Sequence, residues 1–362
     1  MAKNLLQQNF PMIQERTFVQ EQIRKNQVLS SIYDSWKETQ QKEFLEFCTG
    51  ERGVKILYDS FFKEIFNPEY TPERLEDFLS RILKQSVKII TVLPNDSTRI
   101  ADENSLLITD IVVELKDHGI ANVEVQKIGY MFPGQRSACY SADLLLRQYK
   151  RVRGEMEKKF SYRGIRNVYT IVLFEHSTKE FRQYREQYLH HFRQKSDTGL
   201  ELELLQEYYF VSLDIFREHT HNKGIKTKLD AWLTFLTSDD PETILLLIEK
   251  FPEFRPMYEE IYRLCGNLEE VMGMFSKELQ EMDRNTVQYM IDVMQDEIDA
   301  SKKLLEEQDG RLKLQEQEQR LYEKLAEEGR QEELLRAVKD EVFRQDLIKK
   351  REARADDDGG QA

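Results

Sequence analysis

Residues 106–127 read LLITDIVVELKDHGIANVEVQK, two β-rich runs on either side of the turn residues 116–119. Successive side chains of a strand point to opposite faces, so Asp110 shares a face with aliphatic residues of the first run. In the second run Glu124 and Gln126 share a face. The short turn predicts a β-hairpin in which the two polar faces coincide. The hairpin therefore places Asp110, Glu124 and Gln126 where one polar cluster can form inside an apolar sheet.

Such a cluster has chemical consequences, because burying a carboxylate without a partner costs several kcal/mol. Two acids and an amide that converge need a cation, a hydrogen-bond network or open solvent. Mg²⁺ is a natural candidate, since it prefers carboxylate and water oxygens and leaves positions open for a phosphate. The same alternation is also typical of an edge hairpin whose acids face water. Both interpretations stay open on the pattern alone.

Length and composition set the broad class of the protein. The 362 residues, 40% of them apolar, allow one sizeable core with an appended segment, or two domains. No apolar run approaches the ~20 residues of a membrane span, and the N-terminus has no signal-peptide pattern. Three cysteines without CxxC spacing indicate a reducing compartment and no zinc motif. We therefore expect a cytoplasmic protein without a membrane segment.

Charge is distributed unevenly along the chain. The net charge of -13 disfavours nucleic-acid binding, yet residues 125–170 hold ten basic and three acidic residues, a local +7. Residues 296–362 hold 20 acids and 14 bases, a local -6. Positive charge directly after the acidic hairpin would let phosphate approach a metal site. A solvated helix face would explain the same run.

Hydrophobic periodicity divides the chain into four predicted parts: a helical segment over 1–54, an α/β domain over 55–228, a helical extension over 229–295, and a charged long helix with a disordered acidic end over 296–362. The last part is predicted to be interrupted near Gly310 and Gly329, and its leucines favour self-association into a homo-oligomer.

The α/β domain is predicted to be a mixed sheet flanked by helices. Its elements are expected in the order helix 55–66, a helix opened by Pro72, strand 87–93, the hairpin, helix 136–159, strand 167–174 and strand 208–216. We expect helix 136–159 to carry a polar stripe on one side and to pack against the protein through the other side. The stripe is Arg136, Tyr140, Asp143 and Arg147, and the packed side is Ala138, Ala142, Leu145 and Tyr149.

Several stretches, in this order and spacing, resemble the PD-(D/E)XK nuclease family transposases, also described as recombination-promoting nucleases. The resemblance covers about residues 20–295. The stretches are KILYDSFFKEIFNPE (55–69), DIVVEL (110–115), ANVEVQKIGYMFPGQRSACYSADLLLRQY (121–149), VYTIVLFE (168–175), LDAWLTFL (229–236) and MFSKELQEMDRNTVQYMI (274–291).

The resemblance implies a restriction-endonuclease-like core with helical N-terminal and C-terminal extensions. It implies that Asp110 and Glu124 bind Mg²⁺ or Mn²⁺ and that Gln126 is the third catalytic residue. Gln126 stands where the broad superfamily has lysine, and an amide supplies neither positive charge nor a transferable proton. Lys127 is one position off and is expected on the opposite face.

The implied activity is metal-dependent hydrolysis of DNA phosphodiester bonds by an endonuclease associated with recombination or mobile elements. Arg136, Tyr140 and Arg147 would bind the DNA substrate together with Lys63, which with Asp59 resembles the family's D-x-x-F-K stretch. A structural role, packing the helix on the sheet, would explain Tyr140 and Arg147 equally well. An ion pair or helix cap would account for Asp59 and Lys63 equally well. The alternative function is a catalytically inactive DNA-binding or scaffolding protein with a nuclease-like fold, which Gln126 and the acidic overall charge favour.

Overall fold

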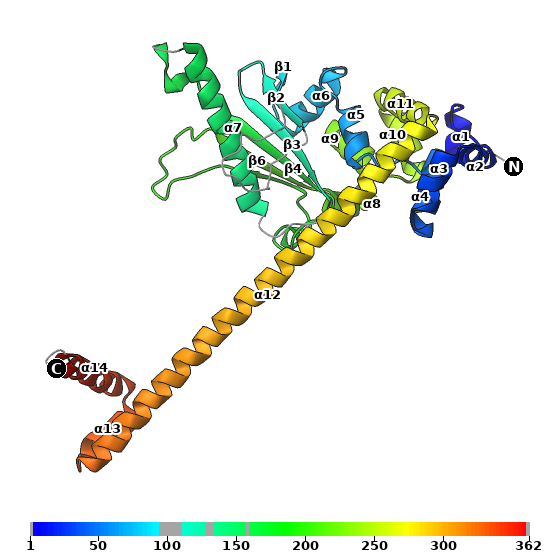
Figure 1. Cartoon of the computed structure of the whole chain (residues 1–362). Coiled ribbons are helices and arrows are strands. Elements are labelled where there is room, and N and C mark those ends of the chain that lie inside the picture. Colours follow the sequence, from blue (N-terminus) through cyan, green and yellow to red (C-terminus); the bar gives the residue numbers. More distant parts are fainter. Residues whose placement is uncertain (1–2, 94–110, 128–132, 157–158, 360–362) are drawn as a thin grey trace. The chain divides into compact units, whose positions relative to one another are not determined.

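A computed structural model describes residues 3–93, 111–127, 133–156 and 159–359 of the chain. The chain forms two compact units, Met1–Tyr289 and Met290–Ala362. The first unit contains the sheet and the candidate site, and Figure 1 gives the element labels. The second unit is helical.

Within the described ranges, six strands form one mixed sheet in the order β1-β2-β3-β4-β6-β5. Strands β3, β4 and β6 are parallel to one another, and the remaining neighbours pair antiparallel. The α/β class predicted from the sequence is confirmed. The strands are β1 Ile89–Val92, β2 Ile111–Leu115, β3 Ile120–Gln126, β4 Val168–Phe174, β5 Leu189–Phe192 and β6 Gln206–Ser212.

The predicted hairpin is formed by β2 and β3. Val112 lies opposite Asn122, so the even-numbered residues of both strands share one face. The connecting turn closes with His118 in the left-handed region at φ 65°, and the Asp117 carboxylate accepts from the Gly119 backbone N–H at 3.0 Å. β2 begins at Ile111, and Asp110 lies outside the described residues.

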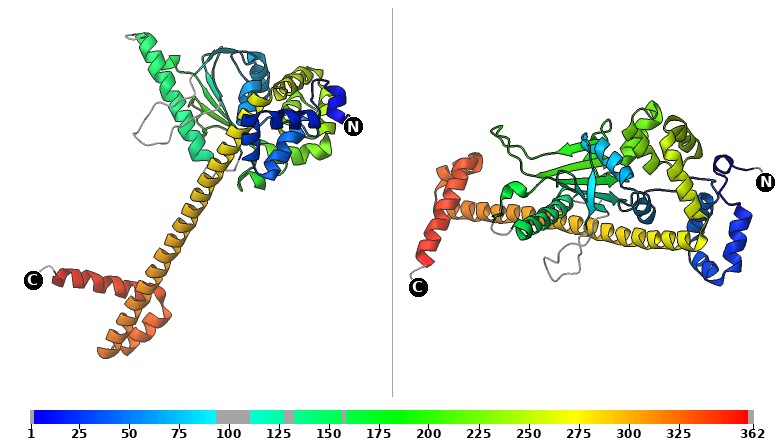
Figure 2. Two further views of the ribbon diagram at one scale, coloured as in Figure 1. Left: turned by 45° about the vertical axis from the view of Figure 1, so that its right-hand side comes forward. Right: turned by 90° about the horizontal axis from the view of Figure 1, so that it is seen from above.

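The two faces of the sheet pack against different helices, as Figures 1 and 2 show. Helix α7, Pro133–Met156, lies across one face, where its Leu144 packs with Val112, Ile120 and Val168. We call this side the α7 face. The opposite face belongs to one large apolar core shared with N-terminal helices and with α5, α6 and α9–α11. These helices are α5 Asp59–Ile65, α6 Pro72–Leu83, α9 Lys228–Thr237, α10 Pro241–Lys250 and α11 Arg255–Cys265.

The N-terminal segment is broken into several short helices where the sequence suggested a continuous amphipathic one. Asn26 is one reason, because its side chain accepts from the backbone N–H groups of Val28 and Leu29 and so starts a new helix. The expected stop after Thr49 is confirmed by Gly50 at φ 69°. The helices are α1 Leu5–Asn9, α2 Arg16–Lys25, α3 Gln27–Asp34 and α4 Glu38–Cys48.

Two strand predictions need correction. The strand expected over 208–216 is β6, which ends at Ser212, and α8, Leu213–Lys223, begins at the next residue. β5 was not predicted, because Leu189–Phe192 is short and contains two histidines between Leu189 and Phe192. Short 3₁₀ helices occur at Tyr162–Gly164, Phe181–Gln183 and Pro252–Phe254.

The long C-terminal helix differs from the prediction at one glycine. Helix α12, Leu268–Glu327, continues through Gly310, because the ~1 kcal/mol penalty of a single glycine is small beside the strong helix formers around it. The predicted break near Gly329 is confirmed at φ 70°. α13 and α14, Gln331–Lys339 and Glu341–Gly359, follow it. The acidic end predicted to be disordered is thus helical as far as Gly359.

Candidate active site

Glu124 and Gln126 lie side by side on the α7 face at the end of β3. Alternation along the strand puts both side chains on this face, and Gln126 Nε2 donates to Glu124 Oε1 at 3.1 Å. Both are buried, with 4% of Glu124 and 1% of Gln126 exposed. The amide therefore fixes one carboxylate oxygen inside the protein.

Arg136, in the first turns of α7, completes the polar cluster. Its Nε lies 3.5 Å from Glu124 Oε1, the oxygen that also accepts from Gln126. Its guanidinium carbon lies 5.4 Å from the centroid of the Tyr140 ring, one turn further along the helix. The Arg136 side chain is 36% exposed against 6% for that of Glu124. Arg136 is thus the member of the cluster that solvent reaches, and its predicted contact with the DNA substrate stays a prediction.

The polar stripe of α7 faces the sheet, contrary to the expected orientation. Tyr140 and Asp143 are 3% and 5% exposed, whereas Ala138 and Ala142 are exposed to solvent. Asp143 forms an ion pair with Arg147, with 2.7 Å between Asp143 Oδ2 and Arg147 Nη2. The orientation is reversed because α7 covers a face that itself carries polar side chains, so the usual rule of apolar residues inward does not hold here.

Other buried polar groups lie under α7. Asn122 and its cross-strand neighbour Thr170 are both completely buried. Among the described residues, neither the Asn122 amide nor the Thr170 hydroxyl has a hydrogen-bond partner. Glu114 at the other end of the hairpin is different, because Arg151 and His118 both bind its carboxylate. Glu114 is therefore neutralised within the fold.

Lys63 belongs to a second charged cluster, in which its Nζ lies 2.8 Å from Asp59 Oδ1. Glu278 of α12 accepts from the Asp59 backbone N–H at 2.9 Å and pairs with Lys127, which is only 10% exposed. Lys127 lies 5.9 Å above the Tyr58 ring. This engagement with α12 fits the expectation that Lys127 does not replace Gln126.

Charge crowding perturbs two groups in this second cluster. Burial, together with the nearby charges of Asp59 and Glu278, raises the pKa of the Glu281 carboxyl. Burial and the adjacent Glu43 carboxylate raise the pKa of the Tyr58 hydroxyl, which donates to Glu43 at 2.6 Å. Tyr58 is therefore a permanent neutral donor, and Glu281 resists ionisation.

The donor set at Glu124 fits a hard divalent cation. Gln126 Oε1 is buried and accepts no hydrogen bond from any described residue, and its side chain adjoins the Glu124 carboxylate, so both residues carry the oxygen donors that such a cation prefers. In the part of the chain that the structure describes, no three His, Cys, Asp or Glu side chains gather in an arrangement that could hold a metal ion. Asp110, the second predicted ligand, lies outside that part.

The family model of the PD-(D/E)XK nuclease family transposases matches residues 56–292, well over half of the chain. The chain belongs to this family. Neither the curated proteins nor the solved structures contain a match. As a PD-(D/E)XK family member, the protein has the restriction-endonuclease-like α/β fold seen in its mixed sheet and flanking helices. The family is one of nucleases associated with transposition, generally uses divalent metals and implies DNA as the substrate class.

No helix among the described residues of this PD-(D/E)XK protein is long and apolar enough to span a membrane. Sequence reasoning missed the Lys127–Glu278 pair, whose members are 151 residues apart. The only signal lay in the family resemblance itself, because the stretch 274–291 that contains Glu278 is one of the motifs that carry it.

Proposed function

We propose that the protein is a metal-dependent DNA endonuclease that hydrolyses phosphodiester bonds, with Asp110, Glu124 and Gln126 as catalytic residues. The observation that carries the proposal is the buried Glu124–Gln126 pair with Arg136 beside it, on the strand where the family resemblance implies a catalytic acid. Asp110 immediately precedes β2 in the sequence, and we assign it as the second carboxylate.

Each residue has a role that follows from its chemistry. Asp110 and Glu124 would hold Mg²⁺ or Mn²⁺, which when bound neutralises phosphate charge and lowers the pKa of water. Gln126 donates through Nε2 to orient the Glu124 carboxylate, and its Oε1 can accept a hydrogen bond from the attacking water without removing the proton. An amide cannot take that proton, so Gln126 acts by positioning.

Arg136 is the proposed first contact of the scissile phosphate. A guanidinium forms paired hydrogen bonds to phosphate oxygens. When DNA binds, Arg136 would leave Glu124 and bind the phosphate, so its charge would have an anionic partner both before and after binding. Tyr140 supports the guanidinium through its ring. Arg147 is held by Asp143 and Lys63 by Asp59, so each would bind DNA only by sharing or exchanging its carboxylate. We propose both as flanking phosphate contacts.

One observation favours the alternative, a nuclease-like DNA-binding or scaffolding protein without activity. Glu124 and Gln126 are closed to solvent in this conformation, and hydrolysis requires phosphate to reach them. In an active protein, the Arg136 side chain would have to move away from Glu124 so that the phosphate can reach it. The burial therefore makes catalysis dependent on a local rearrangement, which an inactive scaffold would not need.

A plasmid assay separates the two functions. We expect Mg²⁺ or Mn²⁺ to support nicking of supercoiled DNA by the wild type, and Asp110→Asn and Glu124→Gln to abolish it. Glu114→Gln is the matched control, because Glu114 is a buried acid on the same face that is already bound by Arg151. Equal nicking by all four proteins, or none by any folded protein, would remove the endonuclease proposal. Melting curves establish that each variant is folded.

We also propose that the protein self-associates through its second unit. The exposed α12 residues Ile291, Ile298, Leu305 and Leu312 recur every seven residues, with exposed fractions of 49%, 48%, 60% and 57%. Seven-residue spacing of apolar side chains is the pattern by which helices pair.

The division of the remaining chain into 55–228 and 229–295 stays a prediction.

A further inference from the structure

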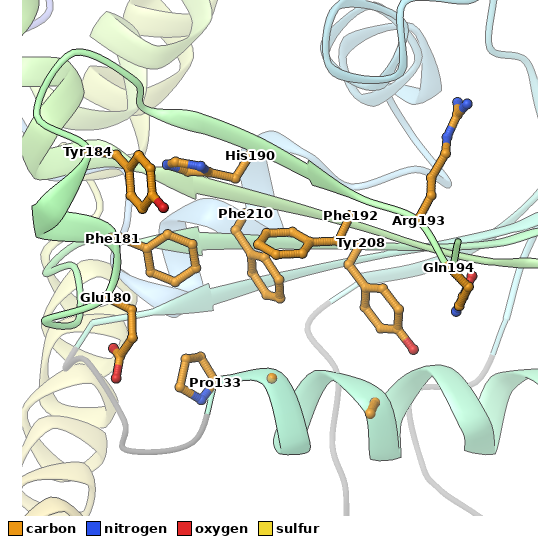
Figure 3. Close-up of a pocket in the computed structure, with 12 residues that line it drawn as sticks. Pro133, Glu180, Phe181, Tyr184, His190, Phe192, Arg193, Gln194, Tyr208 and Phe210 are labelled. Atoms are coloured by element: carbon orange, nitrogen blue, oxygen red, sulfur yellow. The ribbon is translucent and has the colours of Figure 1, made fainter. Parts of the chain in front are cut away.

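A cavity of about 670 Å³ opens on the α7 face, beyond the proposed catalytic residues. It lies between the first turns of α7 and the β5–β6 edge of the sheet, as Figure 3 shows. Its walls are aromatic: Phe181, Tyr184, His190, Phe192, Tyr208 and Phe210. The volume is within the ~300–1,000 Å³ range in which small organic groups bind. Neither the family assignment nor the proposed nuclease chemistry accounts for this cavity.

The aromatic rings form a wall and not a closed core. Phe192 is 49% exposed and Tyr184 is 55% exposed, although both rings are large and largely apolar. Phe210 contacts Phe181 and Phe192, each at 5.4 Å between centroids, and Tyr184 contacts His190 at 5.5 Å. Exposed rings supported from behind by other rings are suited to stacking against a flat ligand.

Polar groups stand at the rim of the cavity. Glu180 and Gln194 line it, and the hydroxyls of Tyr184 and Tyr208 add groups that both donate and accept. Arg193 also lines the cavity, but its guanidinium is engaged by Glu207 at 3.2 Å. A ligand with a flat aromatic body and hydrogen-bonding edges matches this combination, whereas an aliphatic chain would leave the rim groups unused.

The register of the sheet ties the cavity to the proposed catalytic centre. Glu124 is paired with Val172 on β4, Val172 with Phe210 on β6, and Phe210 with His190 on β5. Neighbouring strands lie ~4.8 Å apart, so the Phe210 backbone is roughly 10 Å from that of Glu124 on the same face. Helix α7 reaches both places, since Gly134 lines the cavity and Arg136 contacts Glu124.

The local charge favours a polyanion. Residues 176–195, which supply the 3₁₀ helix Phe181–Gln183 and β5, contain five Lys or Arg and two Glu, a local +3 in a chain of net charge -13. Lys179, Arg182 and Arg185 are exposed at this edge. Basic side chains around an aromatic platform are the combination that binds single-stranded nucleic acid.

We propose that the cavity receives an unpaired nucleobase of the DNA substrate, one or two nucleotides from the scissile phosphate. The preferred substrate would then be single-stranded or locally unpaired DNA. This inference rests on the proposed function, because it names the substrate class of that same site. Base stacking on Phe192 and Tyr184 holds the strand, and the phosphate one step along reaches Arg136 and Glu124.

The test measures binding without cleavage. The full-length Glu124→Gln protein in EDTA is titrated into single-stranded oligonucleotides that contain 2-aminopurine, a base whose fluorescence is quenched by stacking. We expect quenching, and roughly tenfold weaker binding when Phe192→Ala and Tyr184→Ala are added. Phe192→Leu with Tyr184→Leu keeps apolar bulk but loses the ring faces, and should weaken binding similarly. Tyr70→Ala, an exposed tyrosine outside the cavity, is the matched control and should change nothing.

The outcomes separate this inference from the proposed function. Failure of the wild type to nick plasmid, with quenching retained, would overturn the nuclease and leave the nucleobase site. Unchanged single-strand affinity in both folded pocket variants, or preferential binding of fully paired duplex by the parent protein, overturns the nucleobase site, and plasmid nicking by the wild type then still supports the nuclease. Absence of quenching in the parent protein overturns it as well.

Discussion

Removal of one partner of the Lys127–Glu278 pair should destabilise the first unit by an amount that the structure defines. The two side chains are 10% and 1% exposed, so loss of either leaves a charge with little access to water. Breaking a buried pair in this way costs ~3–5 kcal/mol. Glu278 also accepts from the Asp59 backbone N–H, and Glu278→Leu forfeits that hydrogen bond for about 1 kcal/mol more. Glu278→Gln keeps an acceptor and isolates the charge effect.

A double-mutant cycle measures the interaction directly. We expect Glu278→Gln and Lys127→Met each to lower the melting temperature by roughly 6–20 °C, taking the ~3–5 kcal/mol above at ~2–4 °C per kcal/mol for a domain of this size. The double variant should recover most of the loss, because no unpaired charge remains in it. Lys25→Met, from the exposed Lys25–Glu21 pair at 69% and 61% exposure, should shift it by little.

Urea unfolding followed by circular dichroism gives the same free energies independently. A loss of stability in Glu278→Gln as small as that in Lys25→Met would show that the pair is not a buried one. Losses of the two single variants that simply add in the double variant would show that Lys127 and Glu278 do not interact. Raising the salt concentration should leave the difference nearly unchanged, because buried charges are poorly screened. Strong salt dependence would place the pair in solvent.

Three further measurements follow from the structure. The raised pKa of Glu281 means that folding favours its protonated form, so the stability gained from protonated Glu281 is complete below the ordinary pKa of 4.5 and is lost as the pH rises through the folded pKa. Glu281→Gln should therefore melt at a higher temperature than the wild type at pH 8 and at the same temperature at pH 4. A difference in melting temperature that does not depend on pH would contradict the assignment. Cys139 is exposed whereas Cys48 and Cys265 are buried, and burial raises the pKa of Cys48, so a thiol reagent should label one cysteine in the native protein and three after denaturation. Charged substitution of Ile298 and Leu305 should reduce the mass measured by light scattering, and an unchanged mass would reject self-association through α12.

The sequence predicted those parts of the fold whose signals are local. Alternation and turn residues were sufficient for the β2–β3 hairpin, and a continuous β-branched run was sufficient for β4. The same alternation placed Glu124 and Gln126 on one face, where the structure finds them in contact. The contact of Arg136 with Glu124 was not predicted.

The remaining features depend on contacts between distant segments. The orientation of α7 could not be predicted from its own periodicity, because it is set by the polar face that the helix covers. Glu278 meets Lys127 only through the tertiary fold, and no spacing along the chain connects them. β5 gains its strand conformation from pairing with β6, and its own residues give a weak signal.

For the proposed nuclease, the parallel ladder of β3, β4 and β6 has a consequence for the products of cleavage. Main-chain hydrogen bonds set the separation between Glu124 and Phe210, and no side-chain substitution lengthens or shortens it. A nuclease that binds a base near Phe210 and cuts the strand near Glu124 would cut at a fixed distance from that base. Fragment ends would fall at a constant count of nucleotides from the captured base, whatever the surrounding sequence.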